Sequence, residues 1–362
     1  MAQRAKKIYL ACDQTAEPAP AALRSFTQPW LDLNDKAVLV TGGTGSFGKH
    51  FVRTVIDHYK PRRLIIFSRD ELKQYEMQQL FPMDQHPFMR YFIGDVRDRD
   101  RLEMAMRDVD YVIHAAALKQ VPTAEYNPFE CIRTNVFGAE NVVSAALRRN
   151  VRKVIALSTD KAANPVNLYG ASKLAADKIF VAANNLAGAD GTRFAVVRYG
   201  NVFGSRGSVV PFFQKLAEGG AGELPITDPR MTRFWITLTQ GVNFVLSSME
   251  MSRGGEIFVP KIPSTTITGL ASLIGPALGQ KVVGIRPGEK LHETMIPADD
   301  SHWTVELDDR FVILASFAAA ARDAYLNRGA KAVSEGFAYS SDTNPEQLDA
   351  QGLQLLLKEA FA

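Results

Sequence analysis

The sequence predicts an α/β protein whose parallel sheet is doubly wound, with helices on both faces, and which carries a smaller, interleaved C-terminal lobe. Three observations predict this fold class. Short apolar runs alternate with helical periodicity over the first two-thirds of the chain, a glycine-rich turn follows the first apolar run, and the alternation loosens after Asn201. Near-continuous apolar strands between helices are typical of a parallel sheet that is buried on both faces.

The length and composition agree with this class. At 362 residues the chain is long enough for about two domains. With 46% hydrophobic and 22% charged residues and a net charge of +3, it resembles an ordinary globular protein and not a disordered one. Its basic pairs are separated by apolar segments, so we expect no nucleic-acid partner.

Cysteine usage and hydropathy indicate the compartment in which the protein is expected to work. Cys12 and Cys131 are far apart and form no C-x-x-C motif, which predicts neither a disulfide framework nor a metal site and agrees with the bacterial cytoplasm. The longest apolar stretch, 311–321, is well short of the roughly 20 residues that span a bilayer, so we expect no membrane segment.

The strands are predicted from their apolar runs, in chain order, at 36–41, 63–67, 89–93, 111–115, 153–157 and 194–198. A helix that follows the first strand is expected to end near Tyr59, before Pro61. Thr237 and Gln240 predict the capping box of a later helix that runs to about Met251. The segment 256–259 then returns as a further strand, so the two lobes are expected to be interleaved.

A glycine motif follows the first strand. Its residues are Gly42, Gly45 and Gly48, with Thr44, Ser46 and Phe47 between them. Glycines at this spacing allow a tight turn and bring a pyrophosphate close to a helix N-terminus, as in a Rossmann-like dinucleotide site. A nucleotide triphosphatase loop is a poorer match, because His50 stands where a Ser or Thr hydroxyl must bind magnesium.

The end of the second strand bears on the choice of dinucleotide. Ser68 and Arg69 come first, with Asp70 and Lys73 after them, and an arginine at this place suits the 2′-phosphate of NADP. We therefore expect NADP in preference to NAD. Asp95 and Val96 follow the third strand and suit the adenine edge, although Asp95 is also a candidate helix cap.

Two further motifs carry catalytic residue types. Tyr169 and Lys173 lie four residues apart on one face of a predicted helix, where the ammonium is expected to lower the pKa of the phenol. Thr159, Asp160 and Lys161 follow a strand at the carboxyl edge of the sheet, where such folds bind their ligands. The combination predicts proton transfer during oxidoreduction of a hydroxyl group.

Eight segments carry a resemblance to a known family: Thr41 to Gly48, Ser68 to Lys73, His114 to Lys119, Ser158 to Lys161, Tyr169 to Lys173, Arg198 to Val202, Met231 to Ile236 and Arg286 to Lys290. The chain resembles the extended short-chain dehydrogenase/reductase family from about Leu33 to its C-terminus. Within that family it is similar to the inverting UDP-N-acetylglucosamine 4,6-dehydratases of bacterial pseudaminic acid biosynthesis. The first 30 residues lie outside the resemblance and are expected to form a flexible extension.

The resemblance implies a lyase that removes water from UDP-N-acetylglucosamine and inverts C-5. It implies Lys161 as the C-5 base and Asp160 as the C-6 acid, with Tyr169, Lys173 and Thr159 beside them. It adds Ala115 and Val202 to the cofactor contacts. It implies a substrate site formed by Lys119, Lys161, Asn201, Arg206, Arg233, Arg286 and Glu289. A homo-oligomer, with a hexamer as one form, and a role in flagellin or surface-glycan modification are further implications.

The implied division of the chain is a flexible extension at 1–30, an NADP-binding Rossmann domain at 31–200 with a return segment near 235–260, and a substrate-binding lobe at 201–362. The acid and base stay open, because a neutral Lys161 requires burial to outweigh its attraction to Asp160, and the exchanged roles cost less before substrate binds. Two other functions stay open: a UDP-sugar 4-epimerase and a non-catalytic NADP-sensing regulator.

Overall fold

A large mixed sheet organises the structure, a computed structural model that describes residues 23–188, 191–205, 207–317 and 319–361. The strand order is β16-β14-β15-β10-β6-β5-β4-β1-β2-β3. All neighbours from β3 to β10 are parallel, whereas β15, β14 and β16 pair antiparallel. The strands are β1 (Ala37–Thr41), β2 (Arg63–Ser68), β3 (Met89–Ile93), β4 (Tyr111–His114), β5 (Lys153–Thr159), β6 (Arg193–Tyr199), β10 (Ile257–Pro260), β14 (Thr304–Glu306), β15 (Arg310–Ile313) and β16 (Lys331–Ala332).

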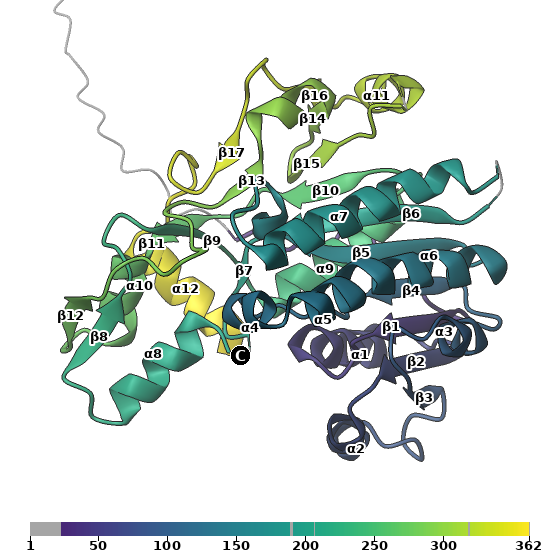
Figure 1. The fold of residues 1–362 in the computed structure, drawn as a ribbon, viewed down its shortest axis with the longest axis horizontal. Coiled ribbons are helices and arrows are strands. Elements are labelled where there is room, and N and C mark those ends of the chain that lie inside the picture. The colour runs from purple at the N-terminus through teal and green to yellow at the C-terminus, as the bar shows by residue number, and fades with distance from the viewer. Residues whose placement is uncertain (1–22, 189–190, 206, 318, 362) are drawn as a thin grey trace, which may run out of the picture.

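Helices cover both faces of this sheet. On one face α3 contacts α6, which contacts α7; on the other α1 contacts α9, which packs on β5 and β6. Figure 1 shows α6 and α7 in front of the sheet and α9 behind it. The helices of this part are α1 (Ser46–His58), α2 (Glu71–Leu80), α3 (Arg99–Ala105), α4 (Val121–Tyr126), α5 (Pro128–Ile132), α6 (Gly138–Arg148), α7 (Leu168–Ala182), α9 (Leu238–Met251) and α11 (Ala319–Leu326). The doubly wound α/β fold that the sequence predicts is therefore confirmed.

The second lobe has its own buried cluster, centred on Trp235, Phe203 and Phe213. It contains three small sheets and lies to the left of the large sheet in Figure 1. Its helices are α8 (Val209–Glu218), α10 (Ile267–Ile274) and α12 (Ala350–Phe361), and its strands are β7 (Asn201–Val202), β8 (Glu223–Ile226), β9 (Thr232–Ile236), β11 (Ser264–Thr266), β12 (Gly279–Val282), β13 (Thr294–Ile296) and β17 (Tyr339–Ser340). The chain leaves this lobe for α9 and β10, so the two parts are interleaved.

Local signals explain where two of these helices begin. The Thr237 hydroxyl accepts the backbone N–H of Gln240, and the Gln240 side chain accepts the backbone N–H of Thr237, which is the predicted capping box of α9. Asn167 caps α7 by accepting the backbone N–H of Gly170, which fixes the first turn that carries Tyr169.

The N-terminal segment differs from the expectation of flexibility through residue 30. Residues 23–33 lie against α9, where the Asn243 amide donates to the Ser25 carbonyl. Phe26 is buried against Phe244, and Arg24 forms a bidentate pair with Glu346. Burial of this aromatic ring and of Leu31 and Leu33 stabilises an ordered path. Residues 23–33 form neither a helix nor a strand, so no regular element marked the segment in the sequence. The earlier residues of the expected extension, 1–22, lie outside the described part of the chain.

A helix that crosses a membrane must be both long and apolar. Within the described ranges, none of the helices has the length and apolar character needed to cross a bilayer.

Candidate active site

A cleft of about 1440 Å³ runs along the carboxyl edge of the parallel strands and into the second lobe. Apart from Asp160, every predicted site residue that the structure describes lines it: Gly42, Thr44, Gly45, Ser46, Phe47, Gly48, Ser68, Arg69, Lys73, Asp95, Val96, Ala115, Lys119, Thr159, Lys161, Tyr169, Lys173, Asn201, Val202, Arg233, Arg286 and Glu289. Arg206 lies outside the described residues. The fold therefore gathers motifs that are far apart in the sequence around one cavity.

The glycine loop forms one end of the cleft. Gly42 has a φ of +64°, and a Cβ atom there would lie 2.8 Å from the Ala116 backbone, so the turn requires glycine. A Cβ atom at Gly48 would collide with the Gly43 carbonyl. Helix α1 begins after Gly45 without a side-chain cap, and Ser46, in its first turn, lines the cleft. Uncapped N–H groups at a helix start suit a pyrophosphate, so this cradle fits a dinucleotide.

The residues after β2 are linked by hydrogen bonds and ion pairs. Asp70 caps α2 and lies 2.8 Å from the Lys73 amine, so its carboxylate already has partners. Arg69 is half exposed and lies 3.4 Å from Asp95. The alternative role of Asp95 as a helix cap does not occur, because Asp98 caps α3. Asp95 instead accepts the backbone N–H of Arg97.

The Lys161 amine lies between two carboxylates at the centre of the cleft. Its Nζ is 3.1 Å from Asp160 Oδ1 and 3.1 Å from Glu293 Oε1. Burial alone lowers the pKa of Lys161, but attraction to these two carboxylates outweighs it and raises the pKa above its usual value. The lysine is therefore held as an ammonium, whereas a neutral base would need burial to dominate.

Asp160 occupies an unexpected place in this cluster. Its side chain is fully buried behind Lys161, so it does not line the cleft. Oδ1 accepts the Thr159 hydroxyl, while Oδ2 has no hydrogen-bond partner. In this arrangement the lysine, and not the aspartate, meets the cavity.

Tyr169 and Lys173 share a face of α7, as predicted, but their electrostatics differ from the prediction. The Lys173 amine donates to the Leu157 carbonyl at 2.7 Å. Burial raises the pKa of Tyr169 to about 12. The nearby Lys161 ammonium opposes this rise, and the Asp160 carboxylate adds to it. The expected lowering of the Tyr169 pKa is therefore wrong, because desolvation of the phenolate dominates.

A buried network supports the strands that carry these groups. Asp177 accepts the Ser158 hydroxyl at 2.9 Å and pairs with Arg198 at 3.2 Å. Arg198 also donates to the Met295 carbonyl at 2.8 Å. The network ties β5, α7 and β6 to β13, two residues beyond Glu293, and so fixes both sides of the Lys161 cluster.

The predicted substrate residues do not form a single group of free cations. Arg233 donates to the backbone carbonyls of Thr232, Leu291 and Lys290, so it anchors the segment before β13. Arg286 lies 3.7 Å from Glu289 at the more exposed end of the cleft. Burial lowers the pKa of Lys119, which also lines the cleft.

Sequence reasoning missed Glu293 and Lys290. Glu293 is buried and lines the cleft, and Lys290 donates to the Ala163 carbonyl beside the Lys161 turn. The sequence signal was weak: His292 and Glu293 resemble the start of a zinc-binding helix, but Ile296 stands where the second histidine is needed. In the described part of the chain no group of His, Cys, Asp and Glu side chains has the arrangement of a metal site.

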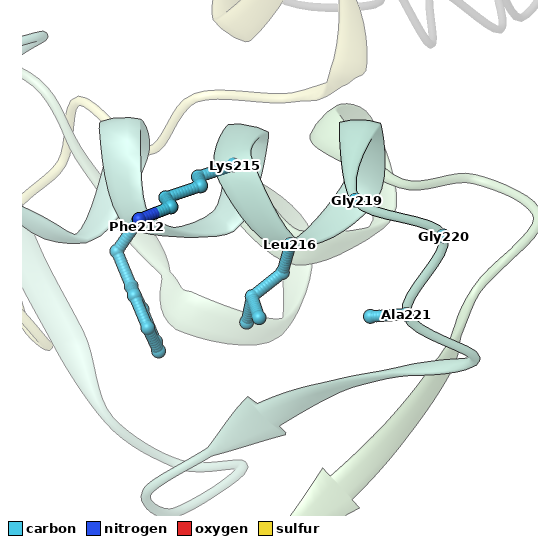
Figure 2. A pocket seen from close by; sticks show the side chains of 6 residues that line it. All are labelled: Phe212, Lys215, Leu216, Gly219, Gly220 and Ala221. Atoms are coloured by element: carbon cyan, nitrogen blue, oxygen red, sulfur yellow. The ribbon is translucent and has the colours of Figure 1, made fainter.

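A second hollow of about 380 Å³ lies beside α8. Figure 2 shows Phe212 and Leu216 pointing to the same side of the helix, near Ala221. Lys215 is its one titratable lining residue. The hollow contains none of the predicted site residues, and its lining offers no acid–base pair.

Comparisons with known proteins agree with this site. Residues 38–315 match the model of a family described as polysaccharide biosynthesis protein. A Campylobacter jejuni protein named UDP-N-acetylglucosamine 4,6-dehydratase (inverting) is 61% identical over 318 residues, which cover 86% of this chain and 94% of that protein. A Rickettsia canadensis protein named UDP-glucose 4-epimerase is 45% identical over 77% of this chain and 83% of its own length.

Solved structures of similar proteins have the same fold. Pen from Bacillus thuringiensis superposes with a TM-score of 0.83 at 36% identity, covering 92% of this chain and all of that one. The dTDP-glucose 4,6-dehydratase DesIV from Streptomyces venezuelae, solved with NAD and TYD bound, has a TM-score of 0.61 at 25% identity over 70% of this chain and 86% of its own. By its sequence and by its short-chain dehydrogenase/reductase type of fold, the chain belongs to the polysaccharide biosynthesis protein family.

Proposed function

We propose that this protein is a hydro-lyase that removes water from UDP-N-acetylglucosamine across C-5 and C-6 and inverts C-5, the reaction named for its Campylobacter jejuni relative. One observation carries the proposal. Lys161 is held by Asp160 and Glu293 in the same cleft as Tyr169 and the glycine loop. A redox step at C-4 needs only a tyrosine, whereas loss of water needs an additional acid and base, and this cluster supplies both.

A nicotinamide cofactor fits the cleft. The glycine loop and the uncapped start of α1 would hold its pyrophosphate, and Ser68, Arg69 and Lys73 would surround the ribose end. When bound, such a cofactor supplies reversible hydride exchange with the sugar. Asp70 is already engaged by α2 and Lys73, so it is poorly placed to take a ribose diol, which supports NADP over NAD.

Residues of the chain carry out the proton transfers. Once C-4 is a ketone, the C-5 hydrogen is acidic. Moving one proton from Lys161 Nζ to Asp160 Oδ1, across their 3.1 Å contact, yields a neutral amine and a carboxylic acid. The amine then takes the C-5 proton. The Asp160 acid, which is buried behind Lys161, has to turn toward the cavity to protonate the departing C-6 hydroxyl, and with that step protons and charges balance. Tyr169 is the candidate donor for C-5 from the opposite face.

The remaining parts of the proposal concern substrate binding, oligomeric state, compartment and pathway. Lys119, Asn201, Arg233, Arg286 and Glu289 are proposed to contact the nucleotide sugar, as their places along the cleft support. We also propose a homo-oligomeric enzyme of the bacterial cytoplasm that acts first in pseudaminic acid biosynthesis. The exposed aromatic side chains of Tyr126 and Phe129 on neighbouring helices support self-association.

A UDP-sugar 4-epimerase is the second candidate. The 45% identity to a protein named UDP-glucose 4-epimerase favours it. An epimerase has no use for an acid and a base at C-5 and C-6, so the Asp160–Lys161 pair argues against this function.

The test is to incubate the purified protein and NADP with UDP-N-acetylglucosamine and follow the product by mass spectrometry and proton NMR. The proposal expects loss of one water and an inverted C-5. An isomer of unchanged mass would establish the epimerase, and no reaction would refute both. Asp160→Asn and Lys161→Ala should each abolish water loss while NADP binding, measured by calorimetry, is retained.

A further inference from the structure

Glu293 is the one buried carboxylate of the described cleft lining that faces three cations at once. Its Oε1 is 3.1 Å from the Lys161 amine and 3.8 Å from the Arg233 Nε, and its Oε2 is 3.8 Å from the Lys290 amine. Oε2 is buried and has no hydrogen-bond partner. A buried carboxylate with an unfilled oxygen is costly, so its position calls for an explanation beyond packing.

The backbone of Glu293 is fixed from the opposite side. Its N–H donates to the Ser341 hydroxyl at 2.9 Å, and its carbonyl accepts the Ser341 N–H at 2.8 Å. Arg233 holds the preceding residues through their carbonyls, and Arg198 holds the Met295 carbonyl. The carboxylate is therefore presented to the cleft from a rigid segment, which is how a reacting group's neighbour is held in place.

Asp160 and Glu293 approach the same amine from two different elements. Asp160 comes from the turn after β5, and Glu293 from the segment before β13. With only one of them, the long lysine side chain would be free to rotate toward solvent, because its exposed fraction is 26%. With both, the Nζ has two acceptors whose positions are independently fixed.

We propose that Glu293 is a positioning residue for the dehydration proposed above, on which this inference rests: its carboxylate holds the Lys161 amine against Asp160 and toward the substrate. Glu293 exchanges no proton in this scheme and acts through Lys161.

The charges around Lys161 determine what removal of Glu293 does. The amine faces Asp160 from its own turn, Glu293 before β13, Arg233 from β9 and the phenol of Tyr169 from α7. Lys290 lies beside Glu293. In Glu293→Gln one carboxylate remains among three cations, so the pKa of Lys161 should fall by about one unit or more.

The experiment compares the wild type with Glu293→Gln, Glu293→Asp and the control Glu256→Gln. Glu256 is also buried, but its carboxylate binds the backbone N–H groups of Arg253 and Gly254, outside the cleft. Turnover of UDP-N-acetylglucosamine gives kcat and KM. The labelling rate of Lys161 by an amine-acylating reagent at one fixed pH of about 9, read by mass spectrometry without substrate, compares the neutral fraction of its amine between the variants.

The inference expects kcat of Glu293→Gln to fall about a hundredfold while KM changes less than about threefold. It expects Lys161 to be labelled about tenfold faster in Glu293→Gln, Glu293→Asp to reverse part of both changes, and Glu256→Gln to leave the labelling rate and kcat unchanged. Wild-type kcat or an unchanged labelling rate of Lys161 in Glu293→Gln would overturn the inference, as would equal changes in Glu256→Gln. A wild type that releases no water would instead refute the proposed function.

Discussion

Replacing Asp177 by Asn should destabilise the protein far more than the loss of a surface charge would. The Asp177–Arg198 pair is 3.2 Å long, and its side chains are 1% and 2% exposed. At that distance two unit charges attract by about 5 kcal/mol with an effective dielectric constant of about 20, and desolvation offsets part of this. Asp177→Asn removes the counter-charge of a buried guanidinium whose Nε already lacks a hydrogen-bond partner, and only neutral acceptors such as the Met295 carbonyl then remain.

The expected loss of unfolding free energy is about 3–5 kcal/mol, the usual range when one partner of a buried ion pair is removed. Urea titrations followed by circular dichroism measure it. The matched control is Glu76→Gln, which removes the partner of Lys49 from a 3.9 Å pair on the surface and should cost less than about 1 kcal/mol.

The double variant Asp177→Leu/Arg198→Met separates charge from packing. It removes both buried charges and keeps comparable volume, so it should cost less than Asp177→Asn alone. A loss below about 1 kcal/mol in Asp177→Asn would refute the reasoning, as would a double-variant loss equal to the sum of the losses in Asp177→Leu and Arg198→Met measured separately.

Three further predictions concern the cofactor, the N-terminal segment and acid stability. Arg69→Ala should weaken NADP binding about tenfold and leave NAD binding nearly unchanged, since a charge-assisted hydrogen bond contributes about 1.5–3 kcal/mol; calorimetry with both dinucleotides tests this, and equal losses would contradict it. Phe26→Ala should lower the unfolding free energy by about 3–5 kcal/mol in urea titrations, because the ring is buried against Phe244; a loss below about 1 kcal/mol would show that the segment contributes little. Burial lowers the pKa of His114 from 6.5 to about 3, so between these values the unfolded chain binds a proton that the folded one does not. Its contribution is complete above pH 6.5 and falls on acidification by about 1.4 kcal/mol per pH unit, a slope that His114→Gln should remove.

The sequence allowed the central strands to be predicted because they are buried on both faces. Runs such as Leu64 to Phe67 are fully buried and read as continuous apolar segments. The pairing of β12 with β8 could not be found in this way, because all four residues of β12 are exposed and carry no apolar pattern.

The site was predictable where a motif is local and not where contacts join distant segments. The glycine loop and the Tyr169–Lys173 spacing depend on neighbouring residues, and both line the cleft. The contact of Glu293 with Lys161 depends on how β13 meets the turn after β5, which no local pattern encodes. The raised pKa of Tyr169 likewise results from burial, which is a property of the assembled fold.

The continuity of the large sheet limits how this chain can be divided. β10 pairs with β6 at Val196 and Val197 and is followed outward by β15 and β14. A fragment that stopped near residue 200 would leave β6 as a bare edge of apolar backbone, which invites pairing with other chains and aggregation. Fusions or chimeras that aim to exchange the sugar specificity of this enzyme class should therefore keep residues 257–332 with the N-terminal half.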